Sequence, residues 1–429
     1  MEFIEPIEDG IIYDMSDLDI EKKIEQYLSV RKEEKNKYGE VFTPTTLINE
    51  MLDKLPPSIW SNPDLKWLDP ANGIGNFPMV AYQRLMKGLA NWETVVSKRS
   101  KHIIENMLYM VEINSKNVNI SKEIFGSKAN ICCVDFLKDC DKWIRQFGIN
   151  KFDVIIGNPP FQDEIKEKDT TIPRKGGKNK LYERITIQCL ELLNKNGLLL
   201  LVTPDNIMTG NTNKAYKEII KYNTLYINFN NIKKRYFSSI GQSMCYFLVQ
   251  KDTKNDKTKT QITNQDNKNI NIILKDRNIN PVRDWSLETE NIITNYVTNE
   301  RNNSVYYRGT TESNYKGGKY TVIYLPNREN IYLKTSNEKL APAIGIKKIV
   351  LFEIVPASNG IIDYKGEYGV GPHTIYIPFQ THTEGKLLER FFKSDIYKTL
   401  VKASITSQYL KVTFISHLNL NKIINIKNL

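Results

Sequence analysis

Short apolar segments alternate with amphipathic segments from residue 65 to residue 202, and this rhythm limits the folds open to the chain. The apolar segments are aliphatic or β-branched along their whole length, as strands buried on both faces are. Amphipathic stretches of helical length separate them, which favours parallel strands joined by right-handed helical crossovers. The rhythm therefore predicts an α/β fold with a doubly wound, mainly parallel sheet. The expected strands are 66–68, 108–111, 130–134, 154–156 and 197–202, with helices over 78–90, 101–107, 115–124, 139–146 and 180–194 and a closing antiparallel pair at 225–228 and 244–250.

The fourth expected strand ends in a stiff turn, Asn158-Pro159-Pro160-Phe161. Prolines have a fixed φ angle and no backbone N–H, so neither a paired strand nor a helix can continue through them. In open α/β sheets, ligands bind at the carboxyl ends of the strands. The turn therefore offers an amide and an aromatic ring to a ligand. An amide oxygen and a backbone carbonyl can both accept hydrogen bonds from an amino group, and Phe161 can stack on a planar base.

Other strand ends carry residues suited to a nucleotide-like ligand. The first strand leads into Asp69-Pro70-Ala71-Asn72-Gly73-Ile74-Gly75, where glycines let the backbone approach a ligand before a helix begins. Pro78 stands where a G-x-G-x-x-G dinucleotide motif has its third glycine, which argues against a nicotinamide or flavin. Glu112 and Asp135 follow the next two strands, where a carboxylate can accept from ribose hydroxyls or from an adenine amino group.

Charge divides the chain into two unequal parts. Residues 1–229 contain 31 Lys and Arg and 32 Asp and Glu, whereas residues 230–429 contain 29 and 17. Clustered Lys and Arg bind polyanions by releasing counterions, so the second part is expected to contact nucleic acid. A basic surface that only keeps the protein in solution is the alternative.

The sequence gives no sign of a membrane segment or of a metal site. No apolar run approaches the roughly 20 residues that span a bilayer, and the acidic amino terminus lacks a signal-peptide pattern. A cytoplasmic, DNA-associated protein is expected. The cysteines form no C-x-x-C pair and the histidines are scattered, so no metal is expected. The cysteines, Cys132, Cys133, Cys140, Cys189 and Cys245, are expected to be reduced thiols.

Composition predicts three segments. Residues 1–37 are acidic and then rich in charge, with Ile20, Ile24 and Leu28 at helical spacing, which predicts an accessory helical extension. Residues 38–252 contain the alternating pattern, and the polar stretch 251–272 is expected to be a linker or a long solvated hairpin. Residues 253–429 have short segments dense in Tyr, Ile, Asn and Gly, which predict a mixed, mostly β domain with helical period only at 384–400.

The ordered motifs resemble those of amino-methylating DNA methyltransferases of the N6-adenine type, which use S-adenosylmethionine. Cofactor motifs precede the catalytic turn and the basic part comes last, as in the gamma class and its restriction-modification methylases. The resemblance covers residues 38–250 and implies a Rossmann-like class I methyltransferase domain, followed by a DNA target-recognition domain. The matching segments are Phe42-Thr43-Pro44, Asp69 to Gly75, Glu112, Asp135-Phe136 and Asn158-Pro159-Pro160-Phe161.

The resemblance also implies roles for individual residues. A duplex adenine must be flipped out to reach a protein pocket, where Asn158 and the Pro159 carbonyl would hold its amino group. Phe161 would stack on one face of the base and Phe237 on the other, with Tyr236 and Tyr182 as alternatives. The sulfonium already makes the methyl group a good electrophile, so positioning supplies most of the catalysis. The implied cofactor-binding residues are Thr43, Asp69, Ala71, Gly73, Gly75, Glu112, Asp135, Phe136 and Asn158.

Double-stranded DNA is the expected partner. Arg and Gln can read base edges, and Lys can position phosphates. A cognate restriction endonuclease on a separate chain is a second partner that the resemblance implies, within a restriction-modification or viral DNA-protection system. The candidate DNA-binding residues are Lys233, Lys234, Arg235, Arg308, Lys316, Lys319 and Gln408.

Other activities fit the residues less well. Carbon-5 cytosine methylation needs a cysteine nucleophile, which follows a proline in that family, and no cysteine follows a proline in this chain. N4-cytosine methyltransferases usually carry Ser at the position of Asn158, so adenine is favoured and cytosine stays open. Protein glutamine methyltransferases share a similar turn but are short. An inactive nucleic-acid-binding protein would be expected to lack Asn158 or the glycines, and both are present.

Overall fold

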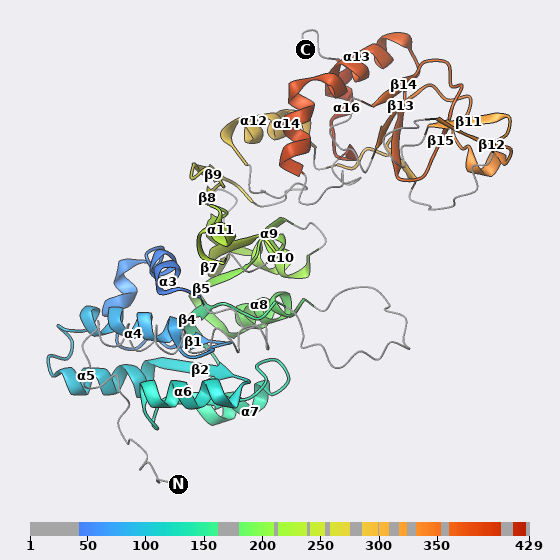
Figure 1. The fold of residues 1–429 in the computed structure, drawn as a ribbon. Coiled ribbons are helices and arrows are strands. Elements are labelled where there is room, and N and C mark those ends of the chain that lie inside the picture. Colours follow the sequence, from blue (N-terminus) through green and yellow to red (C-terminus); the bar gives the residue numbers. More distant parts are fainter. Residues whose placement is uncertain are drawn as a thin grey trace, which may run out of the picture. The chain divides into compact units, whose positions relative to one another are not determined.

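The computed structural model describes residues 43–161, 180–209, 213–237, 241–253, 258–274, 285–298, 300–308, 317–323, 332–352, 360–404 and 415–425 (Figure 1). The extension predicted over residues 1–37 lies outside these ranges. The chain divides into two compact units. The first is Met1–Thr263 with Asn271–Lys275, and the second is Asn264–Ile270 with Asp276–Leu429.

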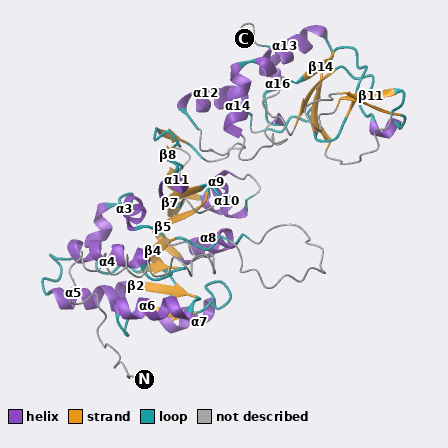
Figure 2. Cartoon of the chain, in the orientation of Figure 1, coloured by secondary structure: helices purple, strands orange, loops and turns teal. Residues whose placement is uncertain are grey.

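Among the described residues, a nine-stranded sheet forms the framework of the first unit, in the order β3-β2-β1-β4-β5-β7-β6-β8-β9. Helices lie beside its strands (Figure 2). Neighbours from β3 to β5 run parallel, and β7 lies antiparallel between β5 and β6. The predicted doubly wound, mainly parallel sheet and its antiparallel pair are confirmed. The strands are β1 Trp67–Asp69, β2 Leu108–Glu112, β3 Asn130–Cys133, β4 Phe152–Gly157, β5 Leu193–Pro204, β6 Tyr222–Asn228, β7 Met244–Thr253, β8 Thr260–Thr263 and β9 Asn269–Ile272.

Helices alternate with these strands, as the sequence rhythm predicts. The expected helix over 101–107 is part of a longer segment, in which α5 passes into the π-helical turn η3. The helices are α3 Thr45–Leu52, η2 Pro57–Ser61, α4 Asn76–Gly88, α5 Val96–His102, η3 Ile103–Met107, α6 Ser115–Phe125, α7 Cys140–Phe147, α8 Leu181–Leu192, α9 Asn206–Thr209, α10 Lys214–Ile219 and α11 Ile232–Tyr236.

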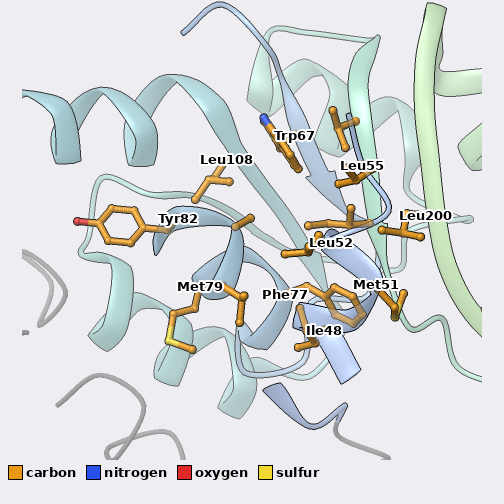
Figure 3. Packing of buried hydrophobic residues seen from close by; sticks show 14 of the residues in the cluster. Ile48, Met51, Leu52, Leu55, Trp67, Phe77, Met79, Tyr82, Leu108 and Leu200 are labelled. Atoms are coloured by element: carbon orange, nitrogen blue, oxygen red, sulfur yellow. The ribbon is translucent and has the colours of Figure 1, made fainter. Parts of the chain in front are cut away.

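Apolar residues cover both faces of the sheet. On one face, α3, α4 and α6 pack against every second residue of the central strands, because successive side chains of a strand point to opposite faces. Figure 3 shows Leu52 of α3 and Phe77 of α4 beside Trp67 of β1 and Leu200 of β5. On the other face, the ring of Tyr109 lies 5.2 Å from that of Phe147 on α7. The faces are therefore filled, and the carboxyl edge of the strands is left for a ligand.

The polar stretch at 251–272 contributes strands to the sheet, and the division between the two compact units falls within it. β8 pairs in parallel with β6, and β9 is the next strand beyond β8. Ile262, Ile270 and Ile272 are buried, and each follows an exposed polar residue, Gln261, Asn269 and Asn271 respectively. This period of two is a strand signal that the Lys, Asn and Thr content obscures.

The second unit contains two smaller sheets, ordered β10-β16-β13-β14 and β12-β11-β15 within the described ranges. The prediction of a mixed region that contains β-sheet is confirmed, although helices take up more of its described residues than strands do. The helical stretch expected at 384–400 is divided at Ser394, whose backbone is extended and whose Oγ accepts from the N–H of Tyr397 at 3.2 Å. The elements are α12 Leu287–Tyr296, β10 Tyr306–Arg308, β11 Tyr320–Ile323, β12 Tyr332–Thr335, η4 Glu338–Leu340, β13 Lys348–Phe352, β14 Ile361–Asp363, β15 Gly369–Val370, β16 Thr374–Pro378, α13 His382–Lys393, α14 Asp395–Ser404 and α16 Leu420–Ile424.

Candidate active site

The carboxyl ends of the parallel strands bring the predicted site residues to one edge of the sheet. Asp69 ends β1 and pairs with Met110 of β2, and Glu112 ends β2 two residues farther on. Asp135 lies two residues past β3, and Asn158 directly follows β4. Four side chains that are distant in the sequence thus face the same region.

The glycine loop between β1 and α4 is bound tightly to its neighbours. Gly73 and Gly75 have φ angles of 58° and 97°, in the left-handed region that glycine favours. A Cβ atom on Gly75 would lie 2.7 Å from the ring of Phe125 on α6. The Asn72 side chain donates to Ser121 Oγ at 2.8 Å. The loop therefore has a fixed shape that requires glycine at its closest approach to α6.

Glu112 connects the glycine loop to the segment after β2. Its Oε2 accepts from the N–H of Gly73 at 2.7 Å, and its Oε1 accepts from the N–H of Asn114 at 2.8 Å. The adjoining Ile113 is 59% exposed. Ile113 was not among the residues predicted from the sequence. Its position directly after a strand-ending carboxylate was the available signal.

Asp69 is a buried carboxyl group with a strongly altered pKa. Its side chain accepts from the N–H of Ala71 at 3.0 Å, and the residue is 2% exposed. Burial raises the pKa of Asp69 to about 8; the Ala71 hydrogen bond opposes this shift and the charge of Glu112 adds to it. A Cβ atom on Gly157 would lie 2.9 Å from Asp69 Oδ1, so β4 passes directly beside this carboxyl group.

The side chain of Asp135 forms hydrogen bonds with the turn that begins at this residue. Its Oδ1 accepts from the N–H groups of Leu137 and Lys138 at 3.0 Å, and Oδ2 lies 3.1 Å from Lys138 Nζ. Partial burial acts to raise the pKa of Asp135, but these bonds outweigh it and the pKa is lowered. Phe136 is buried and stacks on Trp143, with ring centroids 5.3 Å apart. Asp135 therefore presents an ionised, partly exposed carboxylate at the sheet edge.

Thr43 joins the segment before α3 to the proline turn. Its Oγ1 accepts from Asn158 Nδ2 at 3.1 Å, and its backbone carbonyl accepts from Asn76 Nδ2 at the start of α4. These bonds bring a predicted cofactor residue and the predicted catalytic amide together across 115 positions of sequence. Pro159 is buried, whereas Pro160 is exposed. The orientation of the Asn158 amide is thus set by Thr43.

The aromatic residues proposed to stack on a base differ in exposure. Phe161 is partly buried and packs against the core cluster to which Phe237, 2% exposed, belongs. Tyr182 is also buried, and its hydroxyl donates to Asn206 at 2.5 Å. Tyr236 is partly buried and donates to Glu50 Oε2 at 2.7 Å. Phe161 therefore belongs to the proline turn, and Phe237 belongs to the apolar cluster against which Phe161 packs.

The candidate DNA-binding residues fall into three groups. On α11, Lys233 Nζ donates to the Gly241 carbonyl at 3.3 Å, Lys234 is exposed and Arg235 is paired with Glu50 at 2.6 Å. In the second unit, Lys319 Nζ lies 4.7 Å from the ring centre of Tyr320. Lys316, Gln408 and the side chain of Arg308 lie outside the described residues.

The described residues also bear on other kinds of site. No group of three or more His, Cys, Asp and Glu residues there is arranged to hold a metal ion. No helix in those ranges is long and apolar enough to cross a bilayer. All five cysteines lie in the described ranges and none forms a disulfide.

The strand order, the glycine loop and the acidic strand ends define a Rossmann-like α/β protein. In such proteins the ligand binds at the carboxyl edge of the sheet. Residues 80–237 match the family described as Eco57I restriction-modification methylase, which relates the chain to restriction-modification methylases. An "uncharacterized adenine-specific methylase" of Mycoplasma pneumoniae is 25% identical, with 49% of this chain and 67% of that protein covered. "Type II methyltransferase M.CvrRI" of Paramecium bursaria Chlorella virus XZ-6E is 24% identical, with 54% of each chain covered. The resemblance to restriction-modification methylases is thereby confirmed.

Parts of the chain are also similar to solved structures at low identity. A modification subunit of a putative type I restriction enzyme from Vibrio vulnificus YJ016 has a TM-score of 0.43 at 15% identity, covering 58% of this chain and 53% of that one. The DrdV–DNA complex has a TM-score of 0.48 at 13% identity, covering 85% and 52%. The chain thus spans about half the length of both solved structures and of the viral methyltransferase.

Proposed function

We propose that the chain is a DNA methyltransferase that transfers a methyl group from S-adenosylmethionine to the N6 amino group of adenine in double-stranded DNA. The observation that carries the proposal is the hydrogen bond from Asn158 Nδ2 to Thr43 Oγ1, 3.1 Å long. It anchors the amide of the proline turn at the edge that also carries Asp69 and Glu112. A residue that orients an amino group and residues that hold a cofactor therefore share one site.

The residues at this edge fit S-adenosylmethionine, which supplies an electrophilic methyl group on a sulfonium. The bend at Gly73 and Gly75 lets a ligand approach the backbone closely. Each carboxylate oxygen of Glu112 can accept two hydrogen bonds, so Glu112 can accept from ribose hydroxyls as well as from the backbone. The exposed Ile113 offers an apolar surface to an adenine ring, and Asp135 offers an acceptor to its amino group. Asp69 is suited to a positively charged part of the cofactor.

The proline turn would position the substrate amine. Fixing Nδ2 on Thr43 directs the Asn158 oxygen to act as acceptor for an N6 hydrogen, and the Pro159 carbonyl would accept the second hydrogen. The lone pair of the nitrogen is then oriented toward the methyl group, which is catalysis by positioning. An adenine in a duplex reaches this edge only by base flipping, with Phe161 as the stacking surface. Phe237 and the alternatives Tyr182 and Tyr236 are proposed for the second face.

Adenine is favoured over other acceptors. Two cysteines, Cys189 and Cys245, are buried, and burial raises the pKa of each well above its usual value, which disfavours a thiolate nucleophile of the kind that carbon-5 cytosine methylation needs. The name of the Mycoplasma pneumoniae relative is adenine-specific methylase. N4-cytosine methylation remains the second candidate, because the same turn can hold a cytosine amine. Protein glutamine methylation is less favoured, since the second unit then has no role.

We further propose that residues 253–429 form the DNA target-recognition domain after a catalytic domain over 38–252. The excess of Lys and Arg over Asp and Glu in residues 230–429 supports this assignment. A restriction-modification system supplies the biological setting, with a cognate endonuclease as partner and intracellular DNA as substrate.

The test is methylation of duplex DNA by the wild type and two variants, read by sequencing that detects modified bases. Asn158→Ala and Phe161→Ala are expected to lower methyl transfer at least about 100-fold, since misplaced reactants lose that much. S-adenosylmethionine affinity should stay within a few-fold. Asn91→Ala, in an exposed turn after α4, is the matched control and should behave as wild type. Modified cytosine would select the second candidate, and loss of cofactor binding in both variants would show that the turn is misassigned.

A further inference from the structure

Glu50 on α3 is the centre of a hydrogen-bond network that reaches three other elements of the first unit. Its Oε2 accepts from Arg235 Nη2 at 2.6 Å and from the Tyr236 hydroxyl at 2.7 Å, both on α11. Its Oε1 accepts from the Tyr246 hydroxyl of β7 at 3.1 Å and from Asn228 Nδ2 of β6 at 3.2 Å. One carboxylate therefore connects α3 with α11 and with two strands of the sheet.

The pair of Glu50 and Arg235 differs from an ordinary surface ion pair. The side chain of Glu50 is only 23% exposed, and that of Arg235 is 37% exposed. The guanidinium of Arg235 also lies over the ring of Tyr236, 4.7 Å from its centre. Burial acts to raise the pKa of Glu50, but hydrogen bonds from Tyr236 and Arg235 outweigh it and the pKa is lowered. The carboxylate therefore stays ionised and bound to its partners at neutral pH.

The helix that this network holds is too short to be stable by itself. α11 has five residues, and isolated helices of that length do not form in water. Ile232 and Phe237 at its ends are buried in the core cluster against which Phe161 packs. The same helix carries Lys233 and Lys234. Its placement therefore affects both the apolar cluster behind the proline turn and two candidate phosphate contacts.

α3 reaches the proline turn as well. The helix begins at Thr45, two residues after Thr43, whose Oγ1 accepts from Asn158. Glu50 lies on the same helix and binds α11. The segment from Thr43 to Glu50, which includes most of α3, thus connects the amide of the turn with the basic segment that precedes Phe237.

We propose that Glu50 and Arg235 are a positioning pair that fixes α11 beside the proline turn, and that Arg235 is occupied in this pair instead of contacting DNA phosphate. The effect of this pair on the rate of methyl transfer rests on the proposed function. In this arrangement Lys234 contacts phosphate while Arg235 keeps the segment leading to Phe237 in place. The pair thereby couples the cofactor edge to the DNA-facing side of the first unit.

The experiment compares Glu50→Gln and Arg235→Gln with Glu218→Gln. Glu218 pairs with Lys221 at 2.6 Å, the same distance as Glu50 to Arg235, but on the exposed surface of α10. Hydrogen exchange of α11 amides is measured first, because it does not depend on activity. Both variants of the pair should exchange about tenfold faster or more at Arg235 and Phe237, whose N–H groups bond within this turn, and Glu218→Gln should not. Unchanged exchange in both variants overturns the proposal whatever the chain methylates.

The kinetic measurements separate positioning from phosphate binding. Glu50→Gln and Arg235→Gln should each lower the single-turnover rate at saturating DNA about tenfold, and the double variant should be no slower than either. The slope of log affinity against log salt should stay as in wild type for both, and fall by about 0.9 for Lys234→Ala. Tighter DNA binding by Glu50→Gln, with a reduced slope for Arg235→Gln, would identify Arg235 as a phosphate contact and refute the positioning role. Wild-type protein that methylates no DNA would refute the proposed function alone, since the exchange result stands separately.

Discussion

Asp69 leads to a quantitative prediction about cofactor binding and pH. Its carboxyl group is 2% exposed, lies beside Gly157 and has a pKa raised to about 8. At pH 7, a group with this pKa is protonated in about nine molecules of ten. Most of the unliganded protein therefore carries a neutral Asp69. A positive charge of S-adenosylmethionine placed beside Asp69 would favour the ionised form, so binding should release a proton.

The size of the effect follows from ordinary charge interactions. An opposite charge within about 4–6 Å lowers a carboxyl pKa by roughly 1–3 units. The affinity for S-adenosylmethionine should then rise with pH below 8, by up to about tenfold per unit, and become constant above 8. Between pH 6 and pH 8 the gain is about 5- to 50-fold, or roughly 1–2.3 kcal/mol. At pH 7, about 0.4–0.9 protons should leave for each cofactor bound.

Isothermal titration calorimetry in two buffers with different ionisation enthalpies measures this proton release directly. Asp69→Asn has nearly the same shape and no titratable group, so its affinity should be independent of pH and its binding heat the same in both buffers. A wild-type affinity that is constant from pH 6 to 9, with equal heats in both buffers, would refute the reasoning. It would mean that Asp69 is ionised in the free protein or lies far from the positive charge.

Two further predictions concern stability. Gly75→Ala places a Cβ 2.7 Å from the Phe125 ring at a φ of 97°, so the free energy of unfolding of the first unit in urea should fall by about 2–4 kcal/mol. The control is Gly148→Ala, which also has a positive φ but open space around it, and here the free energy of unfolding should fall by about 1–2 kcal/mol. Lys348→Met leaves the buried Asp363 carboxylate without its ammonium partner at 2.7 Å, and the second unit should lose about 3–5 kcal/mol. The double variant Lys348→Met/Asp363→Asn removes the buried charge and keeps an oxygen acceptor for the turn, so it should recover part of the loss; equal stability of the single and double variants would contradict this account.

The central strands could be predicted because strands that are buried on both faces are apolar along most of their length. β4 extends from Phe152 to Gly157, around the expected 154–156, since both faces of the sheet require apolar residues there. The contact between Thr43 and Asn158 has no such pattern: only the order of motifs suggested that the two residues share a site. The network around Glu50 is equally hidden, because its four donors come from three elements whose packing no local period encodes.

The second unit was predicted less sharply because charged residues occur where an apolar pattern would place aliphatic ones. Lys348 begins the buried strand β13 and is itself fully buried, with Nζ donating to Asp363 and to the carbonyls of Ile346 and Tyr368. Asp363 in turn accepts from the N–H groups of Gly366, Glu367 and Tyr368. The ion pair thus gives the turn after β14 its shape. From the sequence alone, Lys348 would be expected on the surface, although no solvent reaches it.

The same residues limit what net charge says about DNA binding. Residues 230–429 contain 29 Lys and Arg against 17 Asp and Glu, yet Lys348 is enclosed with Asp363 and Arg235 is held by Glu50, which lies outside that segment. Cations bound in this way release no counterions when DNA arrives, because they are already neutralised. Exposed lysines such as Lys234 and Lys319 remain available to phosphates. Lys348 and Asp363 both lie in the segment and already cancel in its excess of twelve positive charges, whereas Glu50 neutralises Arg235 from outside it. The salt dependence of DNA affinity should therefore correspond to fewer phosphate contacts than this excess implies, with the Arg235 contact missing.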